Sequence, residues 1–476
     1  MKNKTTSILL LVVTLSSIFK ITAQEINANQ KEANELVHQI VTELTKLPTT
    51  PLGVSVAISK NNIIVYSEGF GYSDLKTKKK VTPKTQFRAG SLSRAITTTA
   101  LAKLVEKKSI NFNDLAQKYL SNYPKKEYKF TVKQLATGLS GMAHYSKNDQ
   151  LENRYYTNVK DAVSVFSHIP LLHKPGDKYQ YSIHAYTLLS WVMEKASNKD
   201  FLTLLGNEIL KPLKMTSTGI EATKNMTKLY NFDAKKEGAH FLEIEKPKNY
   251  SYSLAGAALI STPTDLVKLV NAYNNGYIKK YIVDTFYEVQ KLNSGETIRE
   301  GIGWDNNWDM ADRKVFEQDG AGEGTRSIVS SFPNQKVSIA LMTNALRLWA
   351  IEETAHTLAI PYLTKPMVYK QPKGKFKLIV EEDVRGKWVK RDGFLELDGK
   401  NDKLTINSKE KNEEIYKLIY LKRKNIYALI HPDGVLYTEI DFHNNTISGK
   451  VMYYRGPNIH KTSTEPPYLR FKSSLS

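Results

Sequence analysis

Apolar residues in the first part of the chain recur first at helical and then at strand spacing. Two runs rich in β-branched residues, Gly53–Ser59 and Ile63–Glu68, are separated by the polar tripeptide at 60–62, which predicts a β-hairpin. Before this hairpin, residues 30–46 follow the period of an amphipathic helix. The positions that define this helix are Ala33, Leu36, Val37, Ile40, Val41 and Leu44.

A long helical region separates this hairpin from further strands. Helical patterning dominates from Ser91 to about residue 275, and strand-like runs return at Arg326–Ser331 and Val337–Thr343. A hairpin, a helical body and returning strands indicate an α+β fold, in which helices flank an antiparallel sheet.

The pattern changes again after residue 360. Pro361, Pro366 and Pro372 bracket a short linker. Short alternating runs then follow, separated by turn sequences such as Asp392-Gly393 and Asp398-Gly399. This spacing predicts a small all-β domain, either a meander or a barrel. We therefore expect one domain at residues 24–365 and a separate β-rich domain at residues 373–476.

The N-terminus has the pattern of a secretory signal. Lys2 and Lys4 precede an apolar run, Ser7–Phe19, and Ala23 offers a small residue for cleavage. We expect residues 1–23 to be removed and the mature protein to be periplasmic or extracellular. No other segment approaches the ~18 apolar residues of a membrane-spanning helix, so no transmembrane segment is predicted.

Composition narrows the classes of function. The 476 residues are 41% hydrophobic and 24% charged, which is typical of globular domains. The chain has no cysteine, which excludes a thiol nucleophile, disulfides and zinc–cysteine sites. The formal net charge of +20 could attract anionic envelope polymers or nucleic acid. The lysines are scattered and no nucleic-acid-binding motif is present, so a solvated basic surface is the simpler interpretation.

The histidine pattern suggests no metal site. His168 and His173 are separated by Pro170 and would not share a helical face. His184 is a candidate polar residue near a pocket. We expect no metal and no cofactor, and the sequence does not predict an oligomeric state.

Ser91 is the strongest candidate for a catalytic residue. It opens a predicted helix, where the helix dipole favours a developing oxyanion. Arg94 lies three residues later and returns to the same helical face. Ser-x-x-Lys is the nucleophile motif of β-lactamases and penicillin-binding proteins, and here an arginine occupies the place of the lysine.

The sequence around Ser91 resembles the family of class C β-lactamases, DD-peptidases and related esterases. The resemblance spans residues ~30 to ~360, with the family's sequence blocks in the expected order. These blocks are Gly53–Ile58, Gly69–Tyr72, Val81–Arg88, Thr131–Leu135, Leu139–Gly141, Lys174–Gly176, Tyr179–Ser182, Tyr186–Leu189, Leu210–Met215, Ser261–Leu266, Gly301–Trp304 and Thr343-Asn344.

The resemblance implies a β-lactamase/transpeptidase-like fold and a set of site residues. Ser91 matches the nucleophile that is acylated by a β-lactam, a D-Ala-D-Ala peptide or an ester. Tyr181 matches a tyrosine that assists proton transfer, and the backbone N–H groups of Ser91 and Ala321 match an oxyanion hole. Gln318, Gly320 and Ile183 match substrate-binding positions. The implied partner is a small-molecule or peptide substrate, including peptidoglycan-derived peptides.

Several residues depart from the family pattern. Arg94 cannot act as a general base near neutral pH, because guanidinium does not lose its proton. Ile183 replaces an asparagine, and Gln318 replaces a lysine or histidine that would meet a substrate carboxylate. Gly138 replaces a histidine found in many relatives, and Ala257-Ala258 replaces a glycine pair.

Two functions therefore remain open. In the first, the protein is an exported serine hydrolase of the carboxypeptidase, esterase or peptidase type that forms an acyl-enzyme on Ser91. In this case Arg94 could hold Tyr181 as a phenolate that accepts the serine proton. In the second, the protein is an inactive family member that binds an envelope component. The retained Ser91 and Tyr181 favour the hydrolase.

Overall fold

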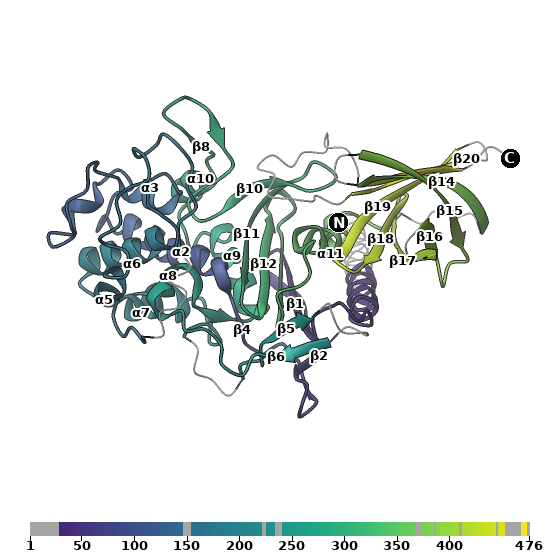
Figure 1. Ribbon diagram of the computed structural model, residues 1–476, viewed down its shortest axis with the longest axis horizontal. Coiled ribbons are helices and arrows are strands. Elements are labelled where there is room, and N and C mark those ends of the chain that lie inside the picture. The colour runs from purple at the N-terminus through teal and green to yellow at the C-terminus, as the bar shows by residue number, and fades with distance from the viewer. Residues whose placement is uncertain are drawn as a thin grey trace, which may run out of the picture.

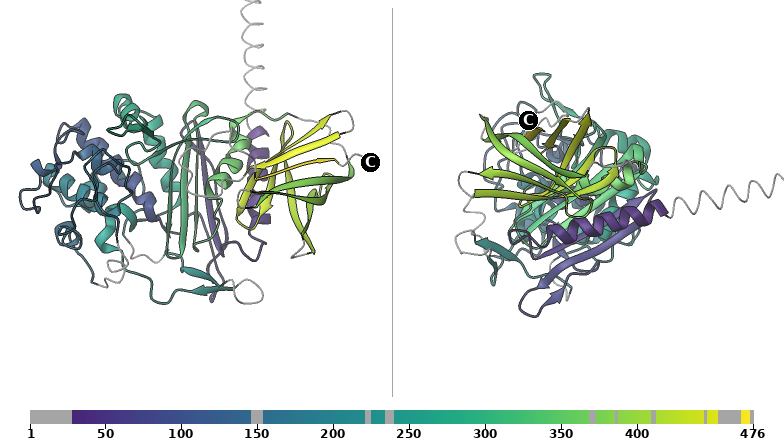
Figure 2. Two further views of the ribbon diagram at one scale, coloured as in Figure 1. Left: turned by 45° about the horizontal axis from the view of Figure 1, so that its top comes forward. Right: turned by 90° about the vertical axis from the view of Figure 1, so that its right-hand side faces the viewer.

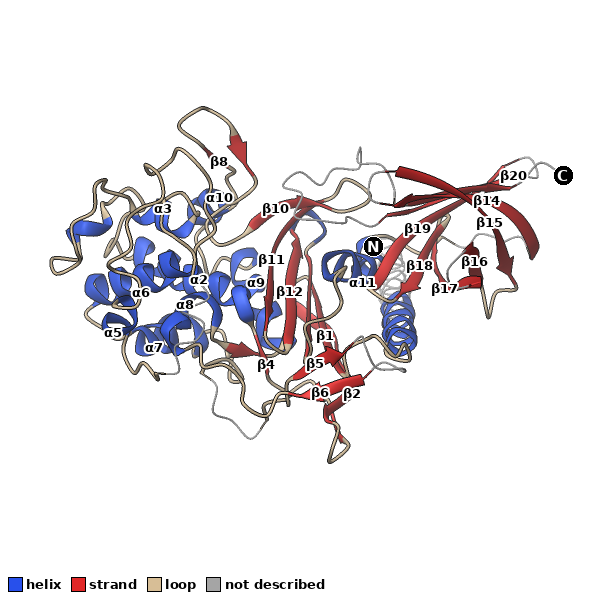
Figure 3. Cartoon of the chain, viewed as in Figure 1, coloured by secondary structure: helices blue, strands red, loops and turns tan. Residues whose placement is uncertain are grey.

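A central sheet separates a helical lobe from a β-barrel (Figures 1 and 3). The computed structural model describes residues 28–145, 154–220, 225–233, 240–367, 373–384, 387–408, 412–443, 446–452 and 468–473. The predicted signal peptide at residues 1–23 lies outside the described residues. No helix within these ranges is both long and apolar enough to span a membrane.

The sheet confirms the predicted antiparallel α+β fold. In the described chain it has seven strands, in the order β10-β11-β12-β13-β1-β2-β3. The N-terminal hairpin pairs β1 with β2, and β1 also pairs with β13, so the first and last strands of this domain are neighbours at the centre of the sheet. The strands are β1 (Gly53–Lys60), β2 (Ile63–Asp74), β3 (Lys79–Lys80), β10 (Asp305–Trp308), β11 (Lys314–Gly322), β12 (Thr325–Phe332) and β13 (Val337–Thr343).

Helices cover both faces of the sheet. The helical lobe packs on one face, and the other carries α11 and the helix at residues 28–44 (Figure 2). The α-helices that follow the N-terminal one are α2 (Ser93–Glu106), α3 (Val132–Ala136), α5 (Val159–Val163), α6 (Ile183–Ser197), α7 (Phe201–Leu205), α8 (Leu254–Ala257), α9 (Pro263–Asn274), α10 (Lys280–Phe286) and α11 (Ile351–Leu363). Shorter helical turns are η1 (Gly90–Leu92), η2 (Ala116–Lys118), η3 (Gly206–Leu210), η4 (Ser251–Ser253) and η5 (Pro333–Gln335).

The C-terminal strands close into a barrel, which is the second of the two predicted forms. Its strands are β14 (Gly374–Val384), β15 (Lys387–Leu397), β16 (Lys403–Ser408), β17 (Asn412–Arg423), β18 (Ile426–His431), β19 (Gly434–His443), β20 (Thr446–Met452) and β21 (Leu469–Ser473). Three two-stranded ladders lie elsewhere in the chain: β4 (Phe87–Arg88) with β7 (Ile260–Ser261), β5 (Tyr230–Asp233) with β6 (His240–Glu243), and β8 (Gln290–Lys291) with β9 (Thr297–Ile298).

The barrel shares an apolar cluster with the sheet. One set of buried side chains joins the helix at 28–44, the outer face of the sheet, α11 and the barrel strands β17 to β20. The β18–β19 turn also bonds the start of α11: Ala350 N donates to Asp433 O at 2.9 Å, and Val435 N donates to Thr354 Oγ1 at 2.9 Å. The barrel is therefore held against α11 by apolar packing and hydrogen bonds, and not only by the chain segment that connects them.

Pro361 does not belong to a linker, contrary to the prediction. It lies inside α11, whose last turn is held by a side chain from the barrel. Arg423 of β17 is only 2% exposed, and its Nη2 donates to Pro361 O at 2.7 Å while its Nε donates to Thr364 O at 3.2 Å. Its Nη1 also lies 3.6 Å from Glu32 Oε1. This guanidinium satisfies carbonyls at the helix end that the helix itself cannot bond.

Two glycines allow the turn η1 to approach β11. Gly90 has φ +58°, a conformation that side chains disfavour, and a Cβ there would lie 3.1 Å from Ala321 N. A Cβ on Gly320 would lie 2.1 Å from Ala89 O. The two backbones are in contact because neither glycine has a side chain.

We expect Arg423→Met to lower the free energy of unfolding by about 3 kcal/mol, because it leaves the buried carbonyls of Pro361 and Thr364 without this donor. Thermal unfolding measured by calorimetry tests this. Arg470→Met is the matched control, since its side chain is 54% exposed and its ion pair with Glu381 should contribute about 1 kcal/mol or less.

Because the sheet, α11 and the barrel share one apolar cluster, we expect the wild type to unfold in a single thermal transition. Two resolved transitions, with Arg423→Met shifting neither, would contradict this view.

We expect Gly320→Ala to separate β11 from η1 and to destabilise the fold by roughly 1–3 kcal/mol, because the new Cβ collides with backbone. Gly322→Ala, two residues along the same strand, is the control: its Cβ would meet only Thr325 Cγ2, at 3.5 Å. Chemical denaturation of the two variants gives the comparison. Equal stabilities would show that β11 can move away at no cost.

Candidate active site

The turn that carries Ser91 is held by the neighbouring strands. Ala89 N donates to Leu259 O at 2.9 Å, and Ser327 Oγ of β12 donates to Ala89 O at 2.6 Å. Ser93, at the start of α2, accepts a hydrogen bond from Leu259 N at 3.1 Å through its side chain. Ser91 thus occupies a 3₁₀ turn that continues into α2, and its side chain is only partly buried.

Tyr181 meets Ser91 directly. The two hydroxyl oxygens are 2.6 Å apart, and either can be the donor. Tyr181 stands just before α6, whose N-cap Ser182 accepts from Ala185 N through its side chain. Ser182 Oγ also donates to Ala143 O at 2.7 Å. Both bonds fix Ser182, the residue after Tyr181, so the helix start helps to orient the phenol toward Ser91.

Arg94 lies beneath this pair and is 7% exposed. Its Nε donates to Ser91 O at 3.3 Å. Its guanidinium carbon lies 4.7 Å from the centroid of the Tyr181 ring and 5.7 Å from that of Tyr186. Burial opposes its charge, but the surrounding tyrosines and Asp305 hold the pKa of Arg94 well above its ordinary value. It is a fixed cation with its plane on aromatic rings.

The phenolate alternative does not fit this geometry. Burial raises the pKa of Tyr181, although Arg94 and the hydrogen bond from Ser91 act in the opposite direction. Arg94 lies over the ring at 4.7 Å from its centroid and favours negative charge on it, but burial has the larger effect. A neutral phenol is therefore the favoured form of Tyr181 near neutral pH.

The backbone of Ala321 lies close to the turn that carries Ser91. It is in contact with Gly90, the residue before Ser91, as the 3.1 Å separation between Ala321 N and a Cβ on Gly90 shows. The Ala321 side chain is exposed and Ser91 is partly exposed. Ala321 therefore lies beside the turn that carries Ser91, and the oxyanion hole formed by the two N–H groups stays a prediction.

The three residues at the expected substrate-binding positions are buried and do not lie on an exposed surface. Ile183 is 1% exposed and packs against Gly256, where a Cβ would lie 3.0 Å from Ile183 Cγ2. Gln318 is fully buried, and its Nε2 donates to Asp319 O at 2.8 Å. Gly320 faces Ala89 and Leu92. The structure gives Ile183 and Gln318 buried, packed positions, and their predicted contacts with a substrate stay predictions.

Two carboxyl groups near Arg94 were not predicted. Tyr179 donates a short hydrogen bond to Glu300 Oε1, and Asp305 follows at the start of β10. Burial raises the pKa of Glu300, and burial together with Glu300 raises the pKa of Asp305. No sequence signal linked these residues to Ser91, because they are about two hundred residues away along the chain.

His144 is a further neighbour of Tyr181 that the sequence did not identify. The two ring centroids are 4.9 Å apart, and Ile183 N donates to His144 Nδ1 at 3.3 Å. It follows the Leu139–Gly141 block by three residues, which was the available signal. His184, by contrast, is 1% exposed and stacks on Phe166 at 4.3 Å, so it lines no open pocket. Among the described residues, no group of three or more His, Cys, Asp or Glu side chains is placed to hold a metal ion.

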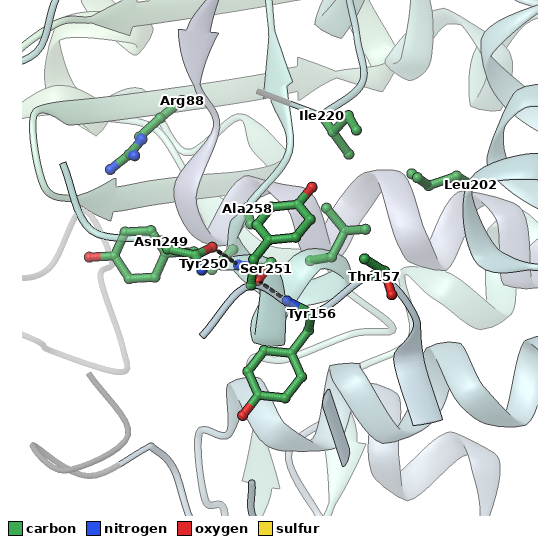
Figure 4. Close-up of a pocket in the computed structure, with 12 residues that line it drawn as sticks. Arg88, Tyr156, Thr157, Leu202, Ile220, Asn249, Tyr250, Ser251 and Ala258 are labelled. Carbon is green, nitrogen blue, oxygen red and sulfur yellow. Dashed lines mark hydrogen bonds between the residues drawn. The ribbon is translucent and has the colours of Figure 1, made fainter. Parts of the chain in front are cut away.

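The pocket in Figure 4 lies beside this site. Its cavity volume is about 120 Å³, and Ala257 and Ala258, at the expected glycine pair, form part of its wall. Arg88, on the strand before η1, forms another part. A hydrogen bond of 2.9 Å from Tyr156 N to Ser251 Oγ joins two of its segments. Ser91 is not among the lining residues of this pocket.

Comparison with known proteins agrees with this arrangement. The family model described as Beta-lactamase matches residues 43–359. Protein flp of Staphylococcus aureus (strain N315) is 26% identical over 303 residues, covering 61% of this chain and 59% of that protein. The mitochondrial serine beta-lactamase-like protein of Homo sapiens is 26% identical over 320 residues, covering 52% of this chain and 57% of that protein. The chain thus spans a little under three-fifths of these curated relatives.

A solved structure shares the arrangement of both domains. The octameric penicillin-binding protein homologue from Pyrococcus abyssi has a TM-score of 0.58 at 18% identity, and the match covers 92% of this chain and 99% of that one. At this identity the match shows the fold alone. The family match, which includes the turn with Ser91 and the strand with Ala321, shows that this chain belongs to the β-lactamase family of serine hydrolases.

Proposed function

We propose that this protein is an exported esterase that forms an acyl-enzyme on Ser91, with carboxypeptidase-type peptides as secondary substrates. The observation that carries the proposal is the 2.6 Å contact between the hydroxyls of Ser91 and Tyr181. A serine nucleophile needs a route for its proton, and this contact supplies one. The export signal at residues 1–23 supports a site outside the cytoplasm.

A neutral Tyr181 can act as a proton relay. As Ser91 Oγ attacks the carbonyl carbon, the serine proton passes to Tyr181 Oη, and the tyrosine proton passes to the departing oxygen. The C–O bond to the leaving group breaks, and Tyr181 is neutral again. Arg94 beneath the ring stabilises the partial negative charge that Tyr181 carries during the transfer.

The residues around Ser91 favour esters over β-lactams. Since no lysine accepts the serine proton, the reaction depends on a leaving group that departs readily, as an alcohol or phenol does compared with an amine. Gln318 is neutral and buried, so it provides no cation for the carboxylate of a penicillin. Such a charged hydrogen bond contributes about 1.5–3 kcal/mol. We therefore expect poor turnover of nitrocefin.

An inactive envelope-binding protein is the second candidate. The observation that favours it is the loss of polar function at Ile183, which is buried against Gly256 where the family pattern has an asparagine. Arg94 also favours an inactive protein, because it replaces the lysine and cannot act as the general base. In this case Ser91 would have no role in any activity.

We expect a fluorophosphonate probe to label Ser91 and Tyr181→Phe to slow labelling by about 10²–10⁴-fold, because the proton relay is lost. Labelling rates followed by intact-mass spectrometry, with the adduct mapped by peptide sequencing, measure this. Tyr123→Phe is the control: this buried tyrosine hydroxyl has no partner among the described residues. If the wild type remains unlabelled and Ser91→Ala changes no activity on p-nitrophenyl acetate, the binding role is the better account.

We expect Arg94→Lys to raise the labelling rate of Ser91 if the missing general base limits the reaction. Lysine has a similar reach and charge, and desolvation at this buried position would help it to lose its proton. The comparison is made over a range of pH. If Arg94→Lys labels more slowly than the wild type, Arg94 serves the tyrosine relay as a fixed cation instead.

A further inference from the structure

A buried ion pair lies directly behind the strand that carries the site. His356 of α11 and Glu317 of β11 are 2.7 Å apart between Nε2 and Oε2, with side chains 6% and 3% exposed. Ser330 Oγ of β12 donates to the same carboxylate at 2.8 Å, and Asn307 Nδ2 of β10 donates a short hydrogen bond to Oε1. Both oxygens of Glu317 are thus bonded, and the donors come from three other elements.

The position of this pair relates it to Ser91. Side chains alternate along a strand, so Glu317 points to α11 while Gln318 and Gly320 point to the opposite face. Gly320 is the residue that touches Ala89, and Ala321 is the residue that touches Gly90. The strand that presents these backbones is therefore anchored from behind, a few residues away, by Glu317.

The same helix holds the barrel. Thr354 of α11 accepts from Val435 N, and Pro361 accepts from Arg423. His356 lies between these two contacts along α11 and is in edge contact with Phe332, their ring centroids being 5.7 Å apart. The barrel, α11, the Glu317 carboxylate and the strand with Ala321 form one continuous chain of contacts.

We propose that Glu317 and His356 are positioning residues of this hydrolase, whose buried contact fixes β11 against α11 and thereby holds Ala321 in place beside Ser91. The proposal rests on the proposed function for its effect on rate. Its structural part concerns the order of β11 and can be measured without any activity. A displacement of about 1 Å in a catalytic group can cost about 10²-fold in rate, so loss of this anchor should be visible.

The charge state of the pair should depend on pH in a defined direction. Burial alone would raise the pKa of Glu317, but His356 and the three hydrogen bonds lower it from 4.5 to about 2. Burial opposes the charge of His356, but Glu317 raises its pKa above 6.5. The contact between charged Glu317 and charged His356 therefore stabilises the fold fully between pH 4.5 and pH 6.5, the ordinary pKa values of the two side chains. This stabilisation is lost as pH falls toward 2, and it is also lost as pH rises through the raised pKa of His356.

Other charged groups face the pair. Asp305 at the start of β10 interacts with Glu317, and Asp309 and Glu352 both raise the pKa of His356. Asp309 is itself paired with Arg313, whose Nη2 lies 2.6 Å from Oδ2. Asp309 and Glu352 favour the protonated histidine, so they support the same direction of pH dependence.

The test compares Glu317→Gln and His356→Gln with the wild type in the full-length mature protein. Fluorophosphonate labelling of Ser91 is measured from about pH 4 to about pH 9, and hydrogen–deuterium exchange is measured for the amides of β11. His38→Gln is the matched control, because His38 also contacts a glutamate, Glu68, at 3.1 Å, but this pair is 57% and 36% exposed and lies away from β11. If Glu317→Gln fails to fold, Ser330→Ala removes one of the same hydrogen bonds.

We expect both variants to label about tenfold more slowly or worse, and to exchange faster in β11, while His38→Gln behaves as the wild type. The alkaline fall in labelling caused by His356 should be absent in His356→Gln. Unchanged labelling and unchanged exchange in β11 would overturn the proposal. If the wild type is never labelled, the proposed function fails, and exchange in β11 alone decides whether the pair positions the strand.

Discussion

The contact between two stretches of backbone, η1 and β11, is the constraint on which the rest of the site depends. It exists because Gly90 and Gly320 have no side chains, and it brings the turn with Ser91 against the strand with Ala321. The remaining features serve this contact: Ser327 and Leu259 hold the turn, while Glu317 and His356 hold the strand. Two backbone segments held in this way need little rearrangement when charge develops on a substrate oxygen.

The buried guanidinium of Arg94 lies beside the nucleophile Ser91. An arginine buried without a paired carboxylate would normally be costly. Here the guanidinium rests on the rings of Tyr181 and Tyr186, and two carboxyl groups of raised pKa lie nearby. The flat, delocalised charge of arginine suits aromatic faces better than a lysine ammonium does. This explains how Arg94 can occupy the position without disrupting the helix that carries Ser91.

Sequence patterns predicted the fold and the central residue pair, but not their surroundings. The hairpin, the returning strands and the C-terminal β-domain follow from local periodicity, and the motifs placed Ser91 near Tyr181. Glu300, Asp305 and His144 could not be found this way, because their proximity depends on tertiary packing. The burial of Gln318 and Ile183 was also missed, since a motif position does not reveal which way a side chain points. Pro361 was misread because the arginine that completes its helix end lies sixty-two residues away.

The alternation of side chains along β11 has a consequence for how this protein can vary in evolution. Glu317 lies on the face of the sheet that packs against α11, whereas Gln318 and Gly320 lie on the opposite face, which contacts η1. Inserting or deleting one residue within the strand would exchange these faces, so that Phe316 or Gln318 would replace Glu317 opposite His356 and Asp319 or Ala321 would replace Gly320 against η1. Length changes should therefore be confined to the turns at either end of β11, while the strand itself can change only by substitution.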